Sequence, residues 1–183
     1  PTFLVAAARD PYGGNLDRVQ VIKGWVDKAG KTHEKIFDVA WSNPEQRKVG
    51  ANGQLTPVGS TVDVATATWT NTIGTPELIA VWKDPEFDPA VRAFYYARVL
   101  EIPTPRWTTI QAKQLGIAPP DVVPPTIQER AWTSPIWYTP NAEAEHPPTL
   151  STVDGWTEIA AVYRVPTGAT QAMLLATEET FGP

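Results

Sequence analysis

Short apolar stretches separated by turn residues recur along the first 140 residues. Residues 3–7 are apolar, residues 18–26 alternate between apolar and polar side chains, and residues 34–41 alternate again after a loop that ends at Gly30. Alternation with a period of two is the pattern of a β-strand that buries one face. We therefore predict a strand in each range, with the last two joined as a hairpin and Gly24 marking a β-bulge.

The same pattern continues toward residue 140. Further strands are predicted at residues 61–70, 77–82, 92–102 and 129–138. Pro135 interrupts the last of these, which places that strand at a sheet edge or gives it a bulge. Residues 108–115 are the one range that suits a helix, which Gly116 would end. Seven short strands without regular intervening helices predict an all-β, antiparallel β-sandwich-like domain with one short helix.

The pattern changes after residue 140. Residues 141–148 are polar and rich in proline, as in a linker, and residues 156–165 and 169–177 are two strand-like runs. The first 140 residues carry fourteen basic and fourteen acidic side chains, whereas residues 141–183 carry one and six. Because two strands alone are at best marginally stable, we predict that residues 141–183 form an acidic two-strand appendage that docks on a partner, as an oligomerisation arm.

Composition excludes several functional classes. The net charge of −5 and the pI near 5.0 argue against nucleic-acid binding, which needs a basic surface. No apolar run approaches the roughly 20 residues of a membrane-spanning helix. Without cysteine the chain has no thiolate nucleophile or thiolate metal ligand, and His33 and His146 are its two imidazoles. We therefore expect no catalytic residue and no cofactor on this chain.

Five blocks carry a resemblance to a known family. They are NLDRVQVIKGWVD at residues 15–27, HEKIFDVA at 33–40, WKDPEFDP at 82–89, RAFYYARVLEIPTPRW at 92–107 and IQERAWTSPIWYTP at 127–140. Together they resemble, in order, the C-terminal part of the bacterial domain-of-unknown-function 3604 family. The resemblance covers residues 1–140, and residues 141–183 depart from it.

The resemblance implies a context for the chain. Members of this family are typically several times longer and exported, and their N-terminal part resembles PHP-type metal-dependent phosphoesterases. A divalent metal would therefore belong to an upstream segment, and we expect a periplasmic or extracellular location. Because Pro1 stands in an apolar run without an initiator methionine or a signal peptide, we expect a processed product or a fragment of such a precursor.

Eight tryptophans raise the question of carbohydrate binding, because exposed indole rings stack on sugars. Most of them fall in predicted strands, where aromatic side chains usually pack in the core or in cross-strand pairs. Trp107 lies instead in a proline-rich loop, so we predict it as the exposed stacking platform. Arg106 beside it either contributes to binding or anchors the loop. Arg98, in an aromatic strand, either contributes to binding or packs over a ring or against a carboxylate.

The acidic residues of the WKDPEFDP block resemble a calcium loop. Asp84, Glu86 and Asp88 alternate as oxygen ligands do in such loops. The loop glycine is missing, so the alternative is a rigid turn in which Asp88 caps a short helical turn. His146, beside acidic residues in the linker, is either solvated or a weak metal ligand.

Three functions follow from these observations. The first is a non-catalytic structural or interaction domain, the C-terminal portion of a larger exported hydrolase-like protein, which self-assembles by strand addition or binds an upstream fragment of its precursor. The second is a carbohydrate- or ligand-binding module. The third is a subunit of a metal-dependent, PHP-like hydrolase whose metal site lies on an upstream segment.

Overall fold

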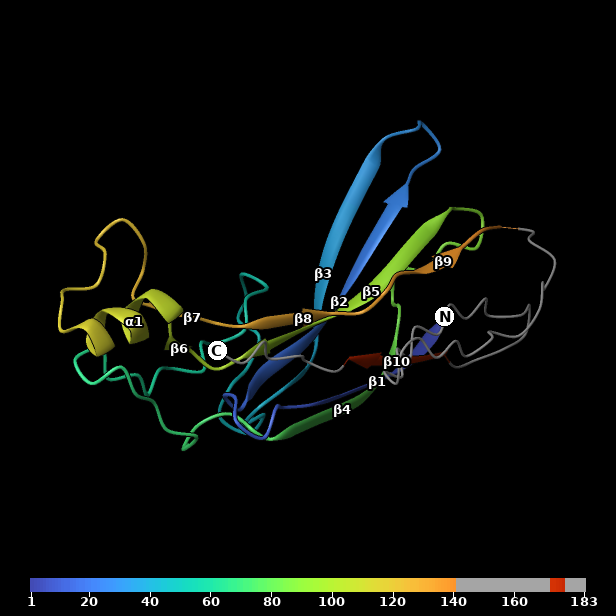
Figure 1. The fold of residues 1–183 in the computed structure, drawn as a ribbon. Helices are drawn as coiled ribbons and strands as arrows, with labels where there is room; N and C mark the ends of the chain where they lie inside the picture. Colours follow the sequence, from blue (N-terminus) through green and yellow to red (C-terminus); the bar gives the residue numbers. More distant parts are fainter. Residues whose placement is uncertain (141–171, 177–183) are drawn as a thin grey trace, which may run out of the picture.

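Strands dominate the architecture, as the alternating pattern predicts. The computed structural model describes residues 1–140 and 172–176, and within these ranges it contains ten strands and one short helix (Figure 1). The predicted all-β, sandwich-like fold is confirmed. None of the described helices is long and apolar enough to cross a membrane.

The larger sheet is antiparallel and has five strands. It contains β2 (Leu16–Val26), β3 (Thr32–Trp41), β5 (Ala93–Glu101), β8 (Arg130–Trp132) and β9 (Ile136–Tyr138). The order is β3-β2-β5, and both β8 and β9 pair with the free edge of β5. Pro135 lies between β8 and β9, so the predicted interruption at a sheet edge is confirmed.

The smaller sheet brings the two ends of the described chain together. Its order is β10-β1-β4, with β1 (Thr2–Ala8) between β4 (Glu77–Lys83) and β10 (Ala172–Ala176). The β1–β4 pair is antiparallel and the β1–β10 pair is parallel. Strand β10 lies within the predicted run at residues 169–177, whereas the run at residues 156–165 lies outside the described residues.

The core lies between the two sheets. Phe3 and Val5 of β1 are buried against Val19 and Val21 of β2, and Tyr95 of β5 completes the contact, with its ring centroid 4.9 Å from that of Phe3. These residues alternate along each strand with residues that point away, which is the periodicity that the sequence predicts. The face of the five-stranded sheet turned away from this core is called the outer face below.

The β-bulge lies elsewhere than at Gly24, so that prediction is wrong. The pairing of β2 with β3 shifts between Val19 and Gln20, and Gly24 pairs in regular register with Glu34 and with Phe94. A Cβ atom at position 24 would lie 2.3 Å from Cζ of Phe94. Glycine is therefore required because the Phe94 ring covers the backbone of the neighbouring strand.

The predicted strand at residues 61–70 is absent. The chain makes a single bridge there, between Asp63 and Thr68. The Asp63 carboxylate accepts hydrogen bonds from the backbone N–H groups of Ala65 and Thr66, and Ala67 has a φ of 55°. Local turn chemistry therefore overrides the β-propensity of the threonine and valine side chains.

The predicted helix forms on an excursion beyond β5. Helix α1 (Trp107–Leu115) ends at Gly116, whose φ of 68° is left-handed, as the sequence predicts. The short strands β6 (Thr104–Pro105) and β7 (Thr126–Ile127) pair at its base. Figure 1 shows this excursion projecting from one end of the sheets.

Candidate functional site

A groove opens where β2, β3, β5 and β9 approach their ends on the five-stranded sheet. Its volume is about 600 Å³, and we call it the aromatic groove. Its lining includes Gly24, His33, Glu34, Arg92, Phe94, Trp137 and Tyr138. Aromatic rings and hydrogen-bonding groups therefore share one concave surface, which is the usual composition of a small-molecule site.

The floor of the aromatic groove follows from the close approach at Gly24. Because position 24 has no side chain, the outer end of the Phe94 ring lies against the backbone of β2. Trp137, which pairs directly with Phe94 across the β5–β9 ladder, places its ring centroid 5.1 Å from that of Phe94 at an angle of 47°. The Trp137 side chain is 58% exposed, so its indole ring is available for stacking.

Polar groups surround these rings. Arg92 and Glu34 are exposed at the groove. His33 stacks on Trp25 with centroids 5.1 Å apart, and its Nε2 lies 2.7 Å from the Asp27 carboxylate. The hydrogen bond to His33, with backbone N–H groups of the hairpin loop, lowers the pKa of Asp27. This carboxylate therefore stays ionised at neutral pH and orients the imidazole ring.

The aromatic surface continues from the groove along β5. Tyr96 stacks on Phe94 with centroids 6.3 Å apart and ring planes 11° apart. One step further on the same face, Arg98 donates from Nε and Nη2 to Oε1 of Gln20, at 2.9 and 2.7 Å. Trp132 pairs opposite Arg98 in β8 and is 57% exposed. The structure therefore places Arg98, a predicted binding residue, on the same face as two exposed indoles.

The predicted calcium residues take part in a different arrangement. The Asp84 carboxylate, which is fully buried, accepts from Lys23 Nζ at 2.6 Å and from the Tyr95 hydroxyl at 2.8 Å, while its second oxygen accepts from the Glu86 N–H. Burial raises the pKa of Asp84, but the bonds from Lys23, Glu86 and Tyr95 outweigh it and hold the pKa below its usual range. Burial beside Asp84 raises the pKa of Tyr95.

The other two carboxylates of that block point elsewhere. Glu86 pairs with Lys35 of β3, and Asp88 accepts from the N–H of Ala90. Among the described residues, no three His, Asp or Glu side chains gather as metal ligands would. The structure therefore does not bring the predicted calcium ligands together, because Asp84 is already neutralised by a lysine. Asp88 caps a turn, as the alternative interpretation of this block expects.

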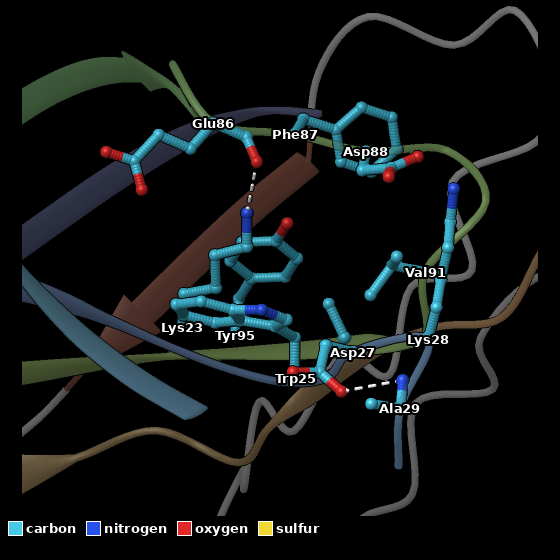
Figure 2. Close-up of a pocket in the computed structure, with 11 residues that line it drawn as sticks. Lys23, Trp25, Asp27, Lys28, Ala29, Glu86, Phe87, Asp88, Val91 and Tyr95 are labelled. Atoms are coloured by element: carbon cyan, nitrogen blue, oxygen red, sulfur yellow. Dashed lines mark hydrogen bonds between the residues drawn. The ribbon is translucent and has the colours of Figure 1, made fainter. Parts of the chain in front are cut away.

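A second pocket, of about 480 Å³, lies beside this ion pair (Figure 2). Lys23 Nζ donates to the Glu86 carbonyl at 2.8 Å and lies 5.3 Å from the centre of the Trp25 ring. Asp27, Asp88 and Lys28 also line the pocket, and Glu86 contributes its backbone carbonyl while its carboxylate pairs with Lys35. The Lys23 ammonium group is thus satisfied by the Asp84 carboxylate, the Glu86 carbonyl and the Trp25 ring, so its role is structural.

The loop residues predicted for binding lie on the excursion that carries α1 and do not line the aromatic groove. Trp107 is the first residue of α1 and is 67% exposed. Arg106 donates from Nε to the Pro124 carbonyl and from its backbone N–H to that of Pro125. These two hydrogen bonds support the interpretation that Arg106 anchors the loop. His146 lies outside the described residues.

Sequence reasoning missed Trp132 and Trp137, which were expected to pack as strand aromatics. Both lie on short strands at the edge of β5, where they are more than half exposed. Pro135 between them was the available signal, because proline indicates a sheet edge. By contrast Trp25 and Trp82 pack against the core, as expected for aromatics in strands.

Comparison with known proteins gives one match. Residues 1–140 match the model of a family described as protein of unknown function (DUF3604). No curated protein and no solved structure matches the chain. Because the match covers residues 1–140 of 183, well over half of the chain, the chain belongs to the DUF3604 family.

Proposed function

We propose that this chain is a non-catalytic binding domain that holds a carbohydrate in the aromatic groove. The observation that supports it is Trp137, whose indole ring is exposed and held at a fixed angle against Phe94. The C–H face of a pyranose ring is apolar and flat, so it stacks on an exposed aromatic ring, and the sugar hydroxyls bond to polar groups around it. Arg92 and Glu34 supply such groups at the groove.

The wider context rests on the family. In this proposal the chain is the C-terminal portion of a larger, exported, hydrolase-like protein in the periplasm or outside the cell. A divalent metal and the bond-breaking residues belong to its N-terminal part. The binding domain then keeps that part close to its substrate, which raises the effective substrate concentration without any new contact at the catalytic site.

Trp137→Ala tests the proposal. Calorimetric titration of the full chain with a panel of soluble glycans should identify a ligand. Trp137→Ala should weaken the binding of that ligand about fivefold, since one aromatic contact is worth about 1 kcal/mol. Trp107→Ala is the matched control, because Trp107 is also exposed but lies on α1. The proposal fails if no glycan binds, or if both substitutions weaken binding alike.

A second function, self-assembly by strand addition, is favoured by the position of β10. This strand comes from the C-terminal region and pairs with the edge of β1, from Phe3 opposite Ala172 to Ala7 opposite Ala176. The same pairing between two chains would link them, because an edge strand accepts any strand of matching register. The measurement that decides it is the oligomeric state with and without β10.

A further inference from the structure

We infer that the carbohydrate is an anionic polysaccharide whose chain runs along β5, from the aromatic groove to Trp132. This inference rests on the proposed function and names the chemical class of its ligand. It depends on two features of the outer face, namely the row of aromatic rings and the surplus of arginine.

The row of rings has the length of several sugar units. Phe94 pairs with Trp137, Tyr96 lies two residues further along β5, and Arg98 pairs with Trp132. Four residues of a strand span about 13 Å, so the two exposed indoles stand at the two ends of an extended surface rather than in one pocket. Such a surface suits an extended polymer better than a single sugar.

The charge of the outer face has the opposite sign to that of the whole chain. The outer face carries Arg18, Glu34, Asp38, Arg98 and Arg130 at outward strand positions and Arg92 immediately before β5. These are four arginines and two carboxylates, on a chain whose net charge is −5. Arg18 is paired with Asp17 at 3.0 Å and lies 3.8 Å from Asp38. With Arg18 and Asp38 set aside, three arginines remain against Glu34, so the surplus on this face is positive.

Three of these arginines are available to a ligand. Among the described residues no carboxylate lies within ion-pair distance of Arg92, Arg98 or Arg130. By contrast the buried cations Lys23 and Arg47 both have a carboxylate partner. Arg98 is held in place by the neutral Gln20, which fixes its guanidinium group without neutralising it.

An anionic glycan matches both features. A guanidinium group forms paired hydrogen bonds with a carboxylate or sulfate group, while the pyranose rings of the same polymer stack on Trp137 and Trp132. A neutral glycan would leave the arginines without a role. Single-stranded nucleic acid also combines rings with anionic groups. Proteins that bind it have a strongly basic groove along its backbone, whereas this chain has a net charge of −5.

Titration of the full 183-residue chain with charged and neutral polymers tests the inference. A polyuronate should bind at least about tenfold more tightly than its methyl ester. Esterification removes the charge of the carboxylates, and losing one hydrogen bond between an arginine and a charged group lowers affinity about tenfold. Added salt should weaken the binding of the polyuronate, because it screens charge, and should leave the binding of the ester unchanged. A sulfated galactan, as a parallel arm, shows which anion the arginines prefer.

Matched variants place the ligand on the outer face. Arg92→Gln with Arg130→Gln should weaken polyuronate binding at least about tenfold, whereas Lys83→Gln, an exposed cation on the other sheet, should not. Trp132→Ala should weaken binding of long oligouronates and leave a disaccharide unchanged, because only a long chain reaches from the groove to Trp132. All of these residues are exposed, so the variants should fold, and thermal unfolding checks this.

The outcomes separate the inference from the proposed function. Equal binding of polyuronate and ester, or unchanged binding in the arginine variant, overturns the inference, while loss of that binding in Trp137→Ala still supports the groove as a carbohydrate site. Tighter binding of single-stranded DNA than of any polyuronate also overturns it. Binding of no glycan at all overturns both.

Discussion

Lys23 shows how one residue can carry charge inside a β-sandwich. Its position in the alternating pattern of β2 is a core position, between Val21 and Trp25, and the residue is buried. The ammonium group is satisfied by Asp84, 61 residues away, and by the Glu86 carbonyl. A buried ion pair of this kind adds little net stability, yet losing one partner leaves a charge in a low-dielectric interior.

We expect Lys23→Met to lower the free energy of unfolding by about 3–5 kcal/mol, because Asp84 then lacks its counter-charge. Chemical denaturation measures this change. Lys35→Met is the control, since the Lys35–Glu86 pair has side chains 44% and 49% exposed and should be worth no more than about 1 kcal/mol. Equal losses in the two variants would contradict a special role for burial.

A second buried ion pair has the same character. Arg47 donates to the Asp17 carboxylate at 2.6 Å and to the Ser42 and Thr56 carbonyls. Asp17 also accepts from Arg18 and from Gln128. These contacts connect the loop after β3 to the start of β2. The buried Arg47–Asp17 pair therefore has a structural role.

At the scale of elements, the pairing of β5 with β2 on one side and with β9 on the other determines the aromatic groove. Each strand alone is an ordinary alternating segment. Side by side, they place Gly24, Phe94 and Trp137 in one row across the sheet. The groove is therefore a property of the register between strands, since a shift of one residue would turn Phe94 to the core face.

We expect Gly24→Ala to lower the free energy of unfolding by about 1–3 kcal/mol, as overpacking does, because its Cβ would lie 2.3 Å from the Phe94 ring. The measurement is a double-mutant cycle with Phe94→Leu, read from urea denaturation. The alanine should cost less when residue 94 is leucine. An unchanged cost would show that Phe94 does not determine the need for glycine.

At the scale of the whole molecule, strand β10 connects the C-terminal region to the N-terminal strand. It pairs with β1 through five residues in parallel register. Without it, the edge of β1 would present unpaired backbone groups to solvent, which recruit other strands. The division into a domain at residues 1–140 and an appendage at 141–183 stays a prediction. Among the described residues, β10 is the part of the second range that pairs with the first.

We expect the full chain to form dimers by exchange of β10, and a chain that ends at residue 171 to lose them. Size-exclusion chromatography with light scattering over a range of concentrations measures this. A chain that ends at residue 176 keeps β10 and is the matched control. An identical oligomeric state in all three chains would rule out strand addition as the basis of assembly.

Much of the fold could be predicted because its signals are local. The hairpin of β2 and β3, the strand β5 and the end of α1 at Gly116 all follow from alternation and turn residues that lie next to each other. The strand at residues 61–70 failed for a local reason too, because Asp63 offered the backbone a competing turn. The candidate site was predicted at Trp107 because loops lie on the protein surface, so an indole in a loop is expected to be exposed.

The amino-acid sequence by itself determined the strand period, the hairpin, the short helix and the family, because each depends on residues that are neighbours along the chain. Only the tertiary structure decided which aromatic residues stay exposed. Trp82 and Trp137 both lie in strands, but Trp82 packs against Phe37 of the opposite sheet, with ring centroids 4.9 Å apart, whereas Trp137 is exposed to solvent. That difference depends on where two sheets overlap, and sheet overlap is a long-range property that alternation along one strand does not contain.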